Sequence, residues 1–314
     1  MDKRVARYAP SPTGPLHLGN LQTALGAWLQ ARLFDCEFWL RIEDLDVSRC
    51  KPIWTNKIVC DLNWLGLNWD KGPGKCDSKY WLQSERSDYY KSVIKTLAET
   101  HRLYPCICSR RDIQELANAP HGPLGSVYPG TCRKRLATTT FTNLFEYECS
   151  LRFAVEPTKL DFTDMILGKT TMQAGTDFGD FVVYRKDAVV AYHLAVVVDD
   201  VVAGVTDIFR GEDLLSSVFP QLCLYEAMQE TPPRYWHAPL RKDDKGDRLS
   251  KRDQSASLQS YIDQGASPAQ IIGTLAYGLG LVELECELTA DELLNSLDPD
   301  DFIQALRVVQ SRAD

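Results

Sequence analysis

The sequence predicts an α/β protein built on an open, doubly wound sheet. Helical and strand-like periodicities alternate through the first hundred residues, as expected when helices cover a mostly parallel sheet. At 314 residues the chain can bury a substantial core in one large or two smaller domains. Its hydrophobic fraction of 44% and charged fraction of 25% are ordinary for a soluble globular protein.

A stiff turn near the N-terminus separates the first strand from the first helix. We expect a strand over Val5 to Ala9 and a helix from about Leu18 to Leu33, with Pro and Gly residues between them. His17 precedes this helix and Gly19 lies in its first turn, where Gly has no side chain to block a close ligand. The unpaired N–H groups and the dipole of a helix N-terminus favour an anion such as a phosphate. A plain turn with one capping polar residue is the alternative.

The second predicted strand ends in an acidic residue. Residues 37–44 alternate between two faces and should form a strand that ends at Glu43. Ligands of open parallel sheets bind beyond the carboxyl ends of the strands, which makes Glu43 a candidate binding residue. An exposed acidic turn is the alternative, and it suits Asp44 and Asp46 better. Helices are expected over residues 51–64 and 87–103.

The character of the chain changes at Tyr104, where an insertion rich in thiols, glycines and short β-like runs begins. Zinc accepts thiolates at tetrahedral positions, and three cysteines here have a suitable pattern. They leave one position open, for which a tyrosine hydroxyl is a candidate. Free buried cysteines are the alternative. The four candidate ligands are Cys106, Cys108, Tyr128 and Cys132.

Sheet-forming sequence returns after the insertion. The run over residues 189–200 is largely apolar, as a buried central strand should be, and Tyr192 is its polar exception. Residues 257–314 have an interrupted helical periodicity and should form a small helical bundle. Leu167 to Thr170 superficially suggests a phosphate loop, but the first glycine of that motif is missing, so we expect a β-turn. The other elements predicted in this half are strands over 180–185, 204–210 and 235–239 and a helix over 214–228.

Charge and cysteine usage limit the location and the partners. The formal net charge is −8, which argues against a nonspecific RNA coat but leaves room for a local basic patch. Most basic clusters of this size are solvated surface. The sequence shows no signal peptide, and its most apolar run is too short to span a bilayer. We therefore expect a cytoplasmic protein without a membrane or DNA partner, whose ten cysteines are reduced thiols or metal ligands.

Two distant motifs carry a family resemblance. Arg7-Tyr-Ala-Pro-Ser-Pro-Thr-Gly-Pro-Leu-His-Leu-Gly-Asn20 resembles the first ATP motif of class I aminoacyl-tRNA synthetases, in the form used by glutamyl-type enzymes, and Asp247-Arg-Leu-Ser-Lys-Arg252 resembles the second. The resemblance implies a Rossmann-like catalytic domain, ATP with Mg²⁺, and L-glutamate as the amino acid. His17 and Lys251 would stabilise charge at the α-phosphate. The ATP-binding positions that the resemblance implies are His17, Gly19, Asn20, Ser250 and Lys251.

Glutamate has two carboxylates and one ammonium, and each needs a partner because unpaired buried charges are costly. In the family resemblance, Glu43 and Ser11 would bind the ammonium, whereas Arg7, Arg210 and Tyr192 would hold the carboxylates. The pattern Cys-x-Cys…Tyr-x-x-x-Cys is also similar to the metal site of one branch of the family, although the loop between its halves is longer here. This similarity favours structural zinc over free cysteines.

The resemblance covers nearly the whole chain and is closest to a short branch of the family. Few residues follow Arg252, so we expect no large anticodon-binding region, and Val196 stands where full-length relatives tend to have Asn. In that branch the activated glutamate goes to queuosine in the anticodon loop of tRNA(Asp), where unpaired bases can be splayed out. The alternatives are a minimal glutamyl-tRNA synthetase that charges the tRNA 3′ end, and a non-catalytic relative that binds RNA or an amino acid.

The expected organisation has four parts. Residues 1–104 and 186–246 would form the two halves of the catalytic domain, and residues 105–185 an inserted α+β subdomain with the zinc site. Residues 247–314 would contain the Lys251 loop and a small C-terminal helical subdomain.

Overall fold

A four-stranded parallel sheet lies at the centre of the computed structural model, which describes residues 3–109, 111–113, 121–122, 125–134, 144–145, 148–238 and 257–313. The strand order is β11-β10-β1-β2. Because β1 pairs with both β2 and β10, the strand order reverses between β1 and β10, which is where ligands bind in open α/β sheets. The four strands are β1 (Val5–Tyr8), β2 (Glu37–Leu40), β10 (Asp207–Gly211) and β11 (Arg234–Ala238).

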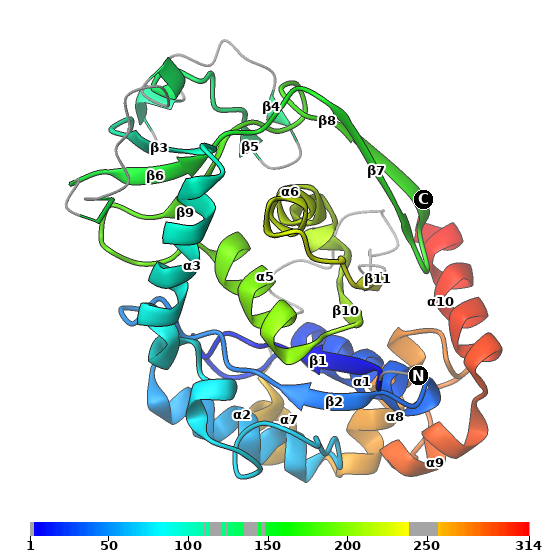
Figure 1. Cartoon of the computed structure of the whole chain (residues 1–314). Coiled ribbons are helices and arrows are strands. Elements are labelled where there is room, and N and C mark those ends of the chain that lie inside the picture. The colour runs from blue at the N-terminus through cyan, green and yellow to red at the C-terminus, as the bar shows by residue number, and fades with distance from the viewer. Residues whose placement is uncertain are drawn as a thin grey trace.

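Helices cover both faces of this sheet, as the doubly wound class predicts. On one face, α1 (Leu18–Leu33) lies so close that a Cβ added at Gly26 would be 2.3 Å from the Phe209 ring of β10. The other face is covered by α5 (Tyr192–Ala203) and α6 (Val218–Met228), which Figure 1 shows above the sheet. The prediction for α1 is confirmed residue for residue.

The prediction of a central strand over residues 189–200 is wrong, because these residues lead into α5 and form most of it. Leu194 to Asp200 are all buried in this helix, so its apolar residues form an unbroken run instead of a stripe. Periodicity cannot distinguish such a run from a buried strand. The helix ends at Gly204, whose φ of 64° is a left-handed cap that glycine adopts readily. Tyr192 is therefore the first residue of a helix.

The inserted stretch forms β structure, and part of it reaches back to the central sheet. Its main sheet has the order β3-β6-β9, with β3 (Leu103–Cys106), β6 (Ser150–Phe153) and β9 (Phe181–Tyr184). A long hairpin, β7 (Lys159–Asp164) and β8 (Gly168–Gln173), extends from this region toward α10 (Figure 1). At its tip the Met165 N–H donates to the Tyr235 carbonyl of β11 at 2.9 Å. The β-turn predicted over Leu167–Thr170 lies slightly earlier, at residues 165–167, because Gly168 already begins β8. A two-stranded ribbon pairs β4 (His121–Gly122) with β5 (Gly125–Ser126).

Several other predicted elements differ in their bounds. The strand predicted over residues 204–210 is β10 (Asp207–Gly211), because Gly204 caps α5. The strand that begins at Glu37 ends at Leu40, and beyond it only Ile42 makes an isolated bridge, with Leu82. The helix predicted over residues 87–103 ends as α3 (Ser87–Glu99), because Leu103 already belongs to β3. The helix predicted from residue 214 begins as a 3₁₀ segment over Glu212–Ser217. The prediction over residues 51–64 is met by α2 (Pro52–Trp64), and short 3₁₀ segments cover Ser78–Tyr80 and Gln83–Arg86.

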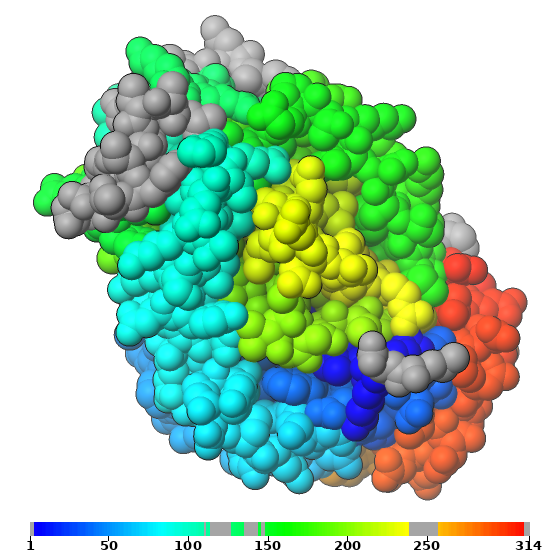
Figure 2. Space-filling model, viewed as in Figure 1, coloured from blue at the N-terminus to red at the C-terminus, as the bar shows by residue number. Residues whose placement is uncertain are grey.

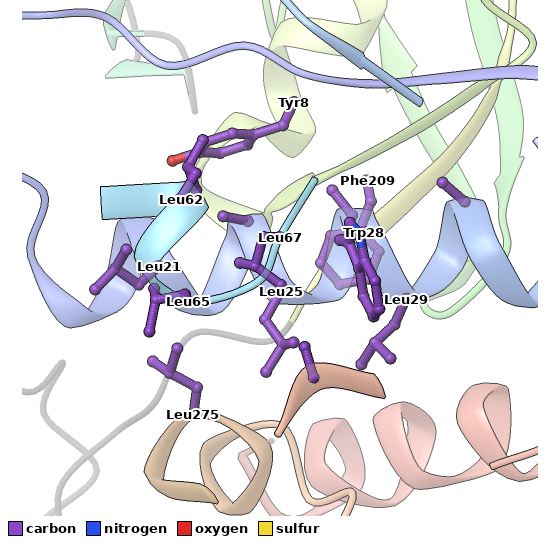
Figure 3. Close-up of a cluster of buried hydrophobic side chains, with 14 of the residues drawn as sticks. Tyr8, Leu21, Leu25, Trp28, Leu29, Leu62, Leu65, Leu67, Phe209 and Leu275 are labelled. Carbon is purple, nitrogen blue, oxygen red and sulfur yellow. The ribbon is translucent and has the colours of Figure 1, made fainter. Parts of the chain in front are cut away.

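The helices predicted for the C-terminal stretch are present, and they pack against α1. Figure 3 shows Leu25, Trp28 and Leu29 of α1 between the sheet residue Phe209 and Leu275 of α8, in a core that excludes water. This core fixes α1 from both sides and so holds its N-terminus beside the end of β1. The C-terminal helices are α7 (Leu258–Asp263), α8 (Pro268–Gly278), α9 (Ala290–Ser296) and α10 (Pro299–Ala313).

On the face of the sheet away from α1, one end of α6 reaches the surface between α3 and the β7–β8 hairpin, as Figure 2 shows. No helix within the described ranges is long and apolar enough to cross a membrane.

Candidate functional site

Arg7 and Arg210 lie on neighbouring strands and on the same face of the sheet. The register pairs Arg7 with Ile208, and strand alternation places Arg210 on that same face, one pleat nearer the carboxyl end. His237 of β11 is paired with Arg210 in the register. Arg7 and Arg210 are 5% and 3% exposed. The structure thus brings together two of the predicted glutamate-binding residues at the point where the strand order reverses.

The Arg7 guanidinium is bound to a carboxylate of the protein itself. Its Nε and Nη2 donate to the two carboxylate oxygens of Asp200, both at 3.2 Å, and Arg41 Nη1 donates to the same carboxylate at 2.6 Å. Burial alone would raise the pKa of Asp200, but Arg41 and Arg7 outweigh it and lower that pKa. Arg7 therefore contributes mainly to the framework of the site, and within the described ranges Nη1 is its donor without a partner.

A second carboxylate of α5 extends this network. Asp199 forms an ion pair with Arg86, whose Nε lies 2.7 Å from a carboxylate oxygen, and it accepts from Gln83 Nε2 at 2.6 Å, while Arg41 Nη2 lies 3.4 Å from a Glu43 oxygen. All of these side chains are at most 10% exposed, so we call the set the buried ion network. Its three guanidinium groups balance its three carboxylates, as burial of charge requires. The network consists of Arg7, Arg41, Arg86, Glu43, Asp199 and Asp200.

Arg210 has a different environment, because its hydrogen-bond acceptors are all neutral. Nε donates to His237 Nε2 at 3.0 Å, Nη1 to Gln221 Oε1 at 3.2 Å and Nη2 to the Leu214 carbonyl at 3.1 Å. Among the described residues, no carboxylate lies within ion-pair distance of it. A guanidinium has five N–H donors, so one on each Nη remains for a ligand.

Further hydrogen-bonding groups without partners surround this guanidinium. The Tyr235 ring lies 5.3 Å from Arg210 Cζ, and its hydroxyl is buried without a partner within the described ranges, as is Nε2 of Gln221, whose Oε1 accepts from Arg210. Buried polar groups in native proteins are nearly always paired, so such a cluster indicates a missing partner. Each of these groups can donate a hydrogen bond, which makes the site complementary to an anion.

A cleft of about 1180 Å³ opens next to this site and continues to the inserted stretch. Ser11, Glu43 and Tyr192 line it, whereas Arg7 and Arg210 are buried and do not belong to its lining. Burial and Glu43 raise the pKa of Tyr192 while Arg210 opposes them, so Glu43 and Arg210 each lie within electrostatic reach of Tyr192. Burial also raises the pKa of Glu43 against the effect of Arg41, and an incoming cation would lower that pKa again.

His17 is the N-cap of α1, so it is not an incidental histidine of the turn. Its Nδ1 accepts from the Asn20 N–H at 3.3 Å, and Asn20 Oδ1 accepts from the His17 N–H at 3.5 Å. Because Nδ1 accepts, the proton of the neutral ring is on Nε2, and burial lowers the pKa of His17. A Cβ at Gly19 would lie 3.2 Å from this ring. Gly19 thus makes room for the imidazole as well as for a ligand.

Ser250 and Lys251 lie outside the described residues, but the chain on either side of them is described. Ser257 forms an isolated β-bridge with His17, and the Leu258 N–H donates to the Leu16 carbonyl at 3.0 Å. The described part of the chain therefore resumes beside His17.

The four predicted metal ligands of the insertion come together. Cys108 Sγ lies 3.7 Å from Cys132 Sγ and 3.6 Å from the Tyr128 hydroxyl, and Cys106 Sγ is 3.4 Å from that hydroxyl. A tetrahedral centre with Zn–S of about 2.3 Å and Zn–O of about 2.0 Å places ligand atoms roughly 3.5–3.8 Å apart, so the donor set fits zinc. Burial opposes ionisation of Cys132, but hydrogen bonds from the Ile107 backbone and from Tyr128 lower its pKa to about 7. Thiolate is the form that binds metal.

Sequence reasoning missed the carboxylates that organise this site. Asp199 and Asp200 are adjacent acidic residues in an otherwise apolar run, and a buried charge must be paired. Two buried acidic residues therefore indicated nearby cationic partners. The signal was hidden because the run was predicted as a strand, which would have pointed the two side chains to opposite faces of the sheet. The roles of His237 and Gln221 were missed as well. Both bind Arg210, but His237 is on another strand and Gln221 is on a helix, so no local sequence pattern connects them to it.

The comparisons with known proteins agree on one family. A model of the catalytic domain of class I tRNA synthetases (E and Q) matches residues 3–310. A glutamyl-Q tRNA(Asp) synthetase of Symbiobacterium thermophilum is 43% identical over 297 residues, which cover 93% of this chain and 91% of that relative. One of Nitratidesulfovibrio vulgaris is 41% identical over 290 residues, which cover 88% of this chain and 86% of the relative.

Among solved structures, the glutamate-tRNA synthetase of Elizabethkingia anophelis matches with a TM-score of 0.77 and 27% identity. The match covers 95% of this chain but 66% of that one, so this chain spans slightly less than two thirds of the solved enzyme.

The capping role of His17 predicts a difference between two substitutions. His17→Ala removes the acceptor for the Asn20 N–H and should lower the free energy of unfolding by about 0.5–1 kcal/mol, whereas His17→Asn keeps a good N-cap and should change it less. The folded-state pKa of His17 is lowered, so the wild type should also lose stability as pH falls below about 6.5, and both variants should lack this component. Urea unfolding at pH 7.5 and 5.5 measures both effects. Equal stability of the two variants at pH 7.5 would exclude the capping role.

Proposed function

The chain belongs to the class I tRNA synthetases of the E and Q type, and on this premise we propose that it activates L-glutamate with ATP and transfers it to queuosine at the first anticodon position of tRNA(Asp). The observation that carries the glutamate assignment is the Arg210 site. A buried guanidinium without a carboxylate partner, surrounded by donors without partners, needs an anion.

In this proposal Arg210 binds the side-chain carboxylate of glutamate. The α-carboxylate has to reach the nucleotide beside His17, so the carboxylate that enters the buried site is the one at the far end of the substrate. Ser11 and Glu43 line the cleft above and bind the ammonium, while Tyr192 and the remaining Nη1 donor of Arg7 complete the pocket. A guanidinium that pairs with a full negative charge also selects glutamate over glutamine.

The proposed chemistry has two steps. An oxygen of the α-carboxylate attacks the α-phosphorus of ATP, the new C–O–P link forms, and pyrophosphate leaves. A hydroxyl of the queuosine cyclopentenediol then attacks the acyl carbon, and AMP leaves. The His17 Nε2–H and the Lys251 ammonium stabilise charge in the first step, in a cradle that includes Gly19, Asn20 and Ser250, and no residue acts as a covalent nucleophile. Mg²⁺ bound to the triphosphate would offset part of its charge.

We further propose that the cluster in the insertion binds a structural Zn²⁺. The Arg152 guanidinium supports this, because its Nε donates to Cys106 Sγ at 3.2 Å and its Cζ lies 3.8 Å from the Tyr128 ring centroid. A cation at this position offsets the excess negative charge of three thiolates around one divalent metal ion. The ligands would be Cys106, Cys108, Tyr128 and Cys132.

One alternative keeps specific support. The chain shares its fold with a glutamate-tRNA synthetase at 27% identity, so glutamate could be charged onto a tRNA 3′ end instead. The names of the more similar relatives, which are glutamyl-Q tRNA(Asp) synthetases, favour the queuosine acceptor. A non-catalytic relative is disfavoured because both ATP motifs keep their His17 and Lys251.

Two assays test the proposed function. Glutamate-dependent exchange of pyrophosphate into ATP should proceed without tRNA, and labelled glutamate should then become attached to queuosine-containing tRNA(Asp) but not to queuosine-free tRNA(Asp). Periodate cleaves the vicinal diol of queuosine, so pretreatment of the tRNA should abolish the transfer. Equal transfer to queuosine-free tRNA would support the 3′-end alternative, and the absence of exchange would contradict both enzymatic readings.

Two substitutions should separate binding from chemistry in the exchange assay. Arg210→Gln removes the buried charge and should raise the KM for glutamate by at least about a hundredfold with little effect on the KM for ATP. His17→Asn keeps the helix cap and should instead lower kcat by about a hundredfold while glutamate binding is retained. Calorimetry with glutamate provides the binding arm. Similar, modest losses in both variants would contradict these roles.

The metal proposal predicts about one zinc per chain in protein purified without chelators. Cys108→Ser and Cys132→Ser should each reduce this content, because thiolate ligands dominate the site. Cys60→Ser is the matched control, since Cys60 is exposed and outside the cluster. Elemental analysis gives the stoichiometry, and a thermal scan with and without chelator should show a loss of stability in the wild type. Zinc content well below one per chain in the wild type would remove the site.

A further inference from the structure

We propose that His237 and Asp164 are positioning residues for Arg210, and that together they set the affinity for glutamate. This inference rests on the proposed function, because it assigns a role within the same pocket. Neither residue belongs to the set that the family resemblance implied. Asp164 stands at the end of β7 and His237 in β11, and they are 1% and 0% exposed.

Asp164, His237 and Arg210 form a chain of two hydrogen bonds, which we call the relay. His237 Nδ1 lies 2.6 Å from Asp164 Oδ2, and His237 Nε2 lies 3.0 Å from Arg210 Nε. Arg210 Nε can only donate, so His237 Nε2 must be the acceptor. The ring proton is therefore on Nδ1 and points at the Asp164 carboxylate. Asp164 thus selects the tautomer that can hold Arg210.

Asp164 is itself fixed by the tip of the hairpin. Its Oδ1 accepts from the N–H groups of Ile166 and Leu167 at 2.9 and 3.0 Å. The same turn is attached to the catalytic sheet through the Met165 N–H and to α10 through Arg307 Nη2, which donates to the Met165 carbonyl at 2.9 Å. Burial would raise the pKa of Asp164, but its bonds to His237 and to these backbone groups lower it, so Asp164 is a carboxylate.

The comparison with Arg7 explains what the relay achieves. Two nitrogens of Arg7 donate directly to Asp200, and that carboxylate would compete with any anionic ligand. Arg210 faces an imidazole, with the negative charge one ring further away. The nearest carboxylate in this chain of contacts acts on Arg210 only through the ring, the orientation of the guanidinium is fixed through Nε, and a donor on each Nη stays available. The relay thus prepares a guanidinium for an incoming carboxylate without occupying it.

Asp164→Asn is the sharpest test, because it keeps the shape of the side chain. The Ile166 and Leu167 N–H groups require an oxygen, so the amide nitrogen must face His237 Nδ1. The ring proton then moves to Nε2 and opposes the Arg210 N–H. In tRNA-independent exchange we expect the KM for glutamate to rise about tenfold to a hundredfold, while the KM for ATP stays within about twofold.

Asp161→Asn is the matched control, since Asp161 is a half-exposed residue of the same strand whose carboxylate pairs with Lys169. It should leave both KM values unchanged. A second measurement needs no variant: ¹⁵N shifts of the wild-type histidines should identify His237 as a neutral ring protonated on Nδ1. A ring protonated on Nε2, or on both nitrogens, would overturn the relay.

The outcomes distinguish the inference from the function on which it rests. If the wild type shows no glutamate-dependent exchange, the proposed function fails regardless of the variant. If the wild type is active and Asp164→Asn leaves the KM for glutamate unchanged, or raises both KM values together with a loss of thermal stability, the positioning role fails. A selective rise in the KM for glutamate at unchanged melting temperature supports it.

Discussion

The carboxylate of Asp200 connects two buried arginines, and the architecture of the cleft depends on this contact. Arg7 comes from β1 and Arg41 from the extended chain after β2, yet both donate to one side chain of α5. Any of these groups alone would be costly inside the protein, whereas together with Asp199, Arg86 and Glu43 they are electrically balanced. The network therefore fixes α5 over the sheet, and α5 in turn places Tyr192 at the cleft.

Against this balanced background, Arg210 is the buried guanidinium whose partners are all neutral. The two arginines occupy the same face of adjacent strands but have different partners, because Arg7 donates to a carboxylate and Arg210, among the described residues, to neutral groups. The hairpin that carries Asp164 belongs to the inserted stretch, which also carries the cysteine cluster. The insertion thus contributes to the proposed glutamate pocket through His237, in addition to lining the cleft beside it.

Local patterns predicted the elements whose signals are local. The helix over Leu18–Leu33 was predicted with its exact bounds because a Pro/Gly turn precedes it, and the cysteine cluster because its ligands follow a recognisable pattern. The strand predicted around Tyr192 failed because a fully buried helix and a buried strand have the same apolar composition. The partners of Arg7 and Arg210 could not be read from the sequence, since Asp200 and His237 are brought to them by pairing between distant elements. The positions of Ser250 and Lys251 stay predictions.

The most direct test of this account is the free energy of unfolding of Asp200→Asn, measured with urea at pH 7. The substitution leaves buried guanidinium charge uncompensated and should cost about 3–5 kcal/mol. Asp187→Asn is the matched control: Asp187 also pairs with an arginine through two hydrogen bonds, one of them 2.9 Å long, but the Arg185 and Asp187 side chains are 45% and 53% exposed. That loss should be below about 1 kcal/mol. Similar small losses in both variants would contradict the claim that the buried ion network holds the site together.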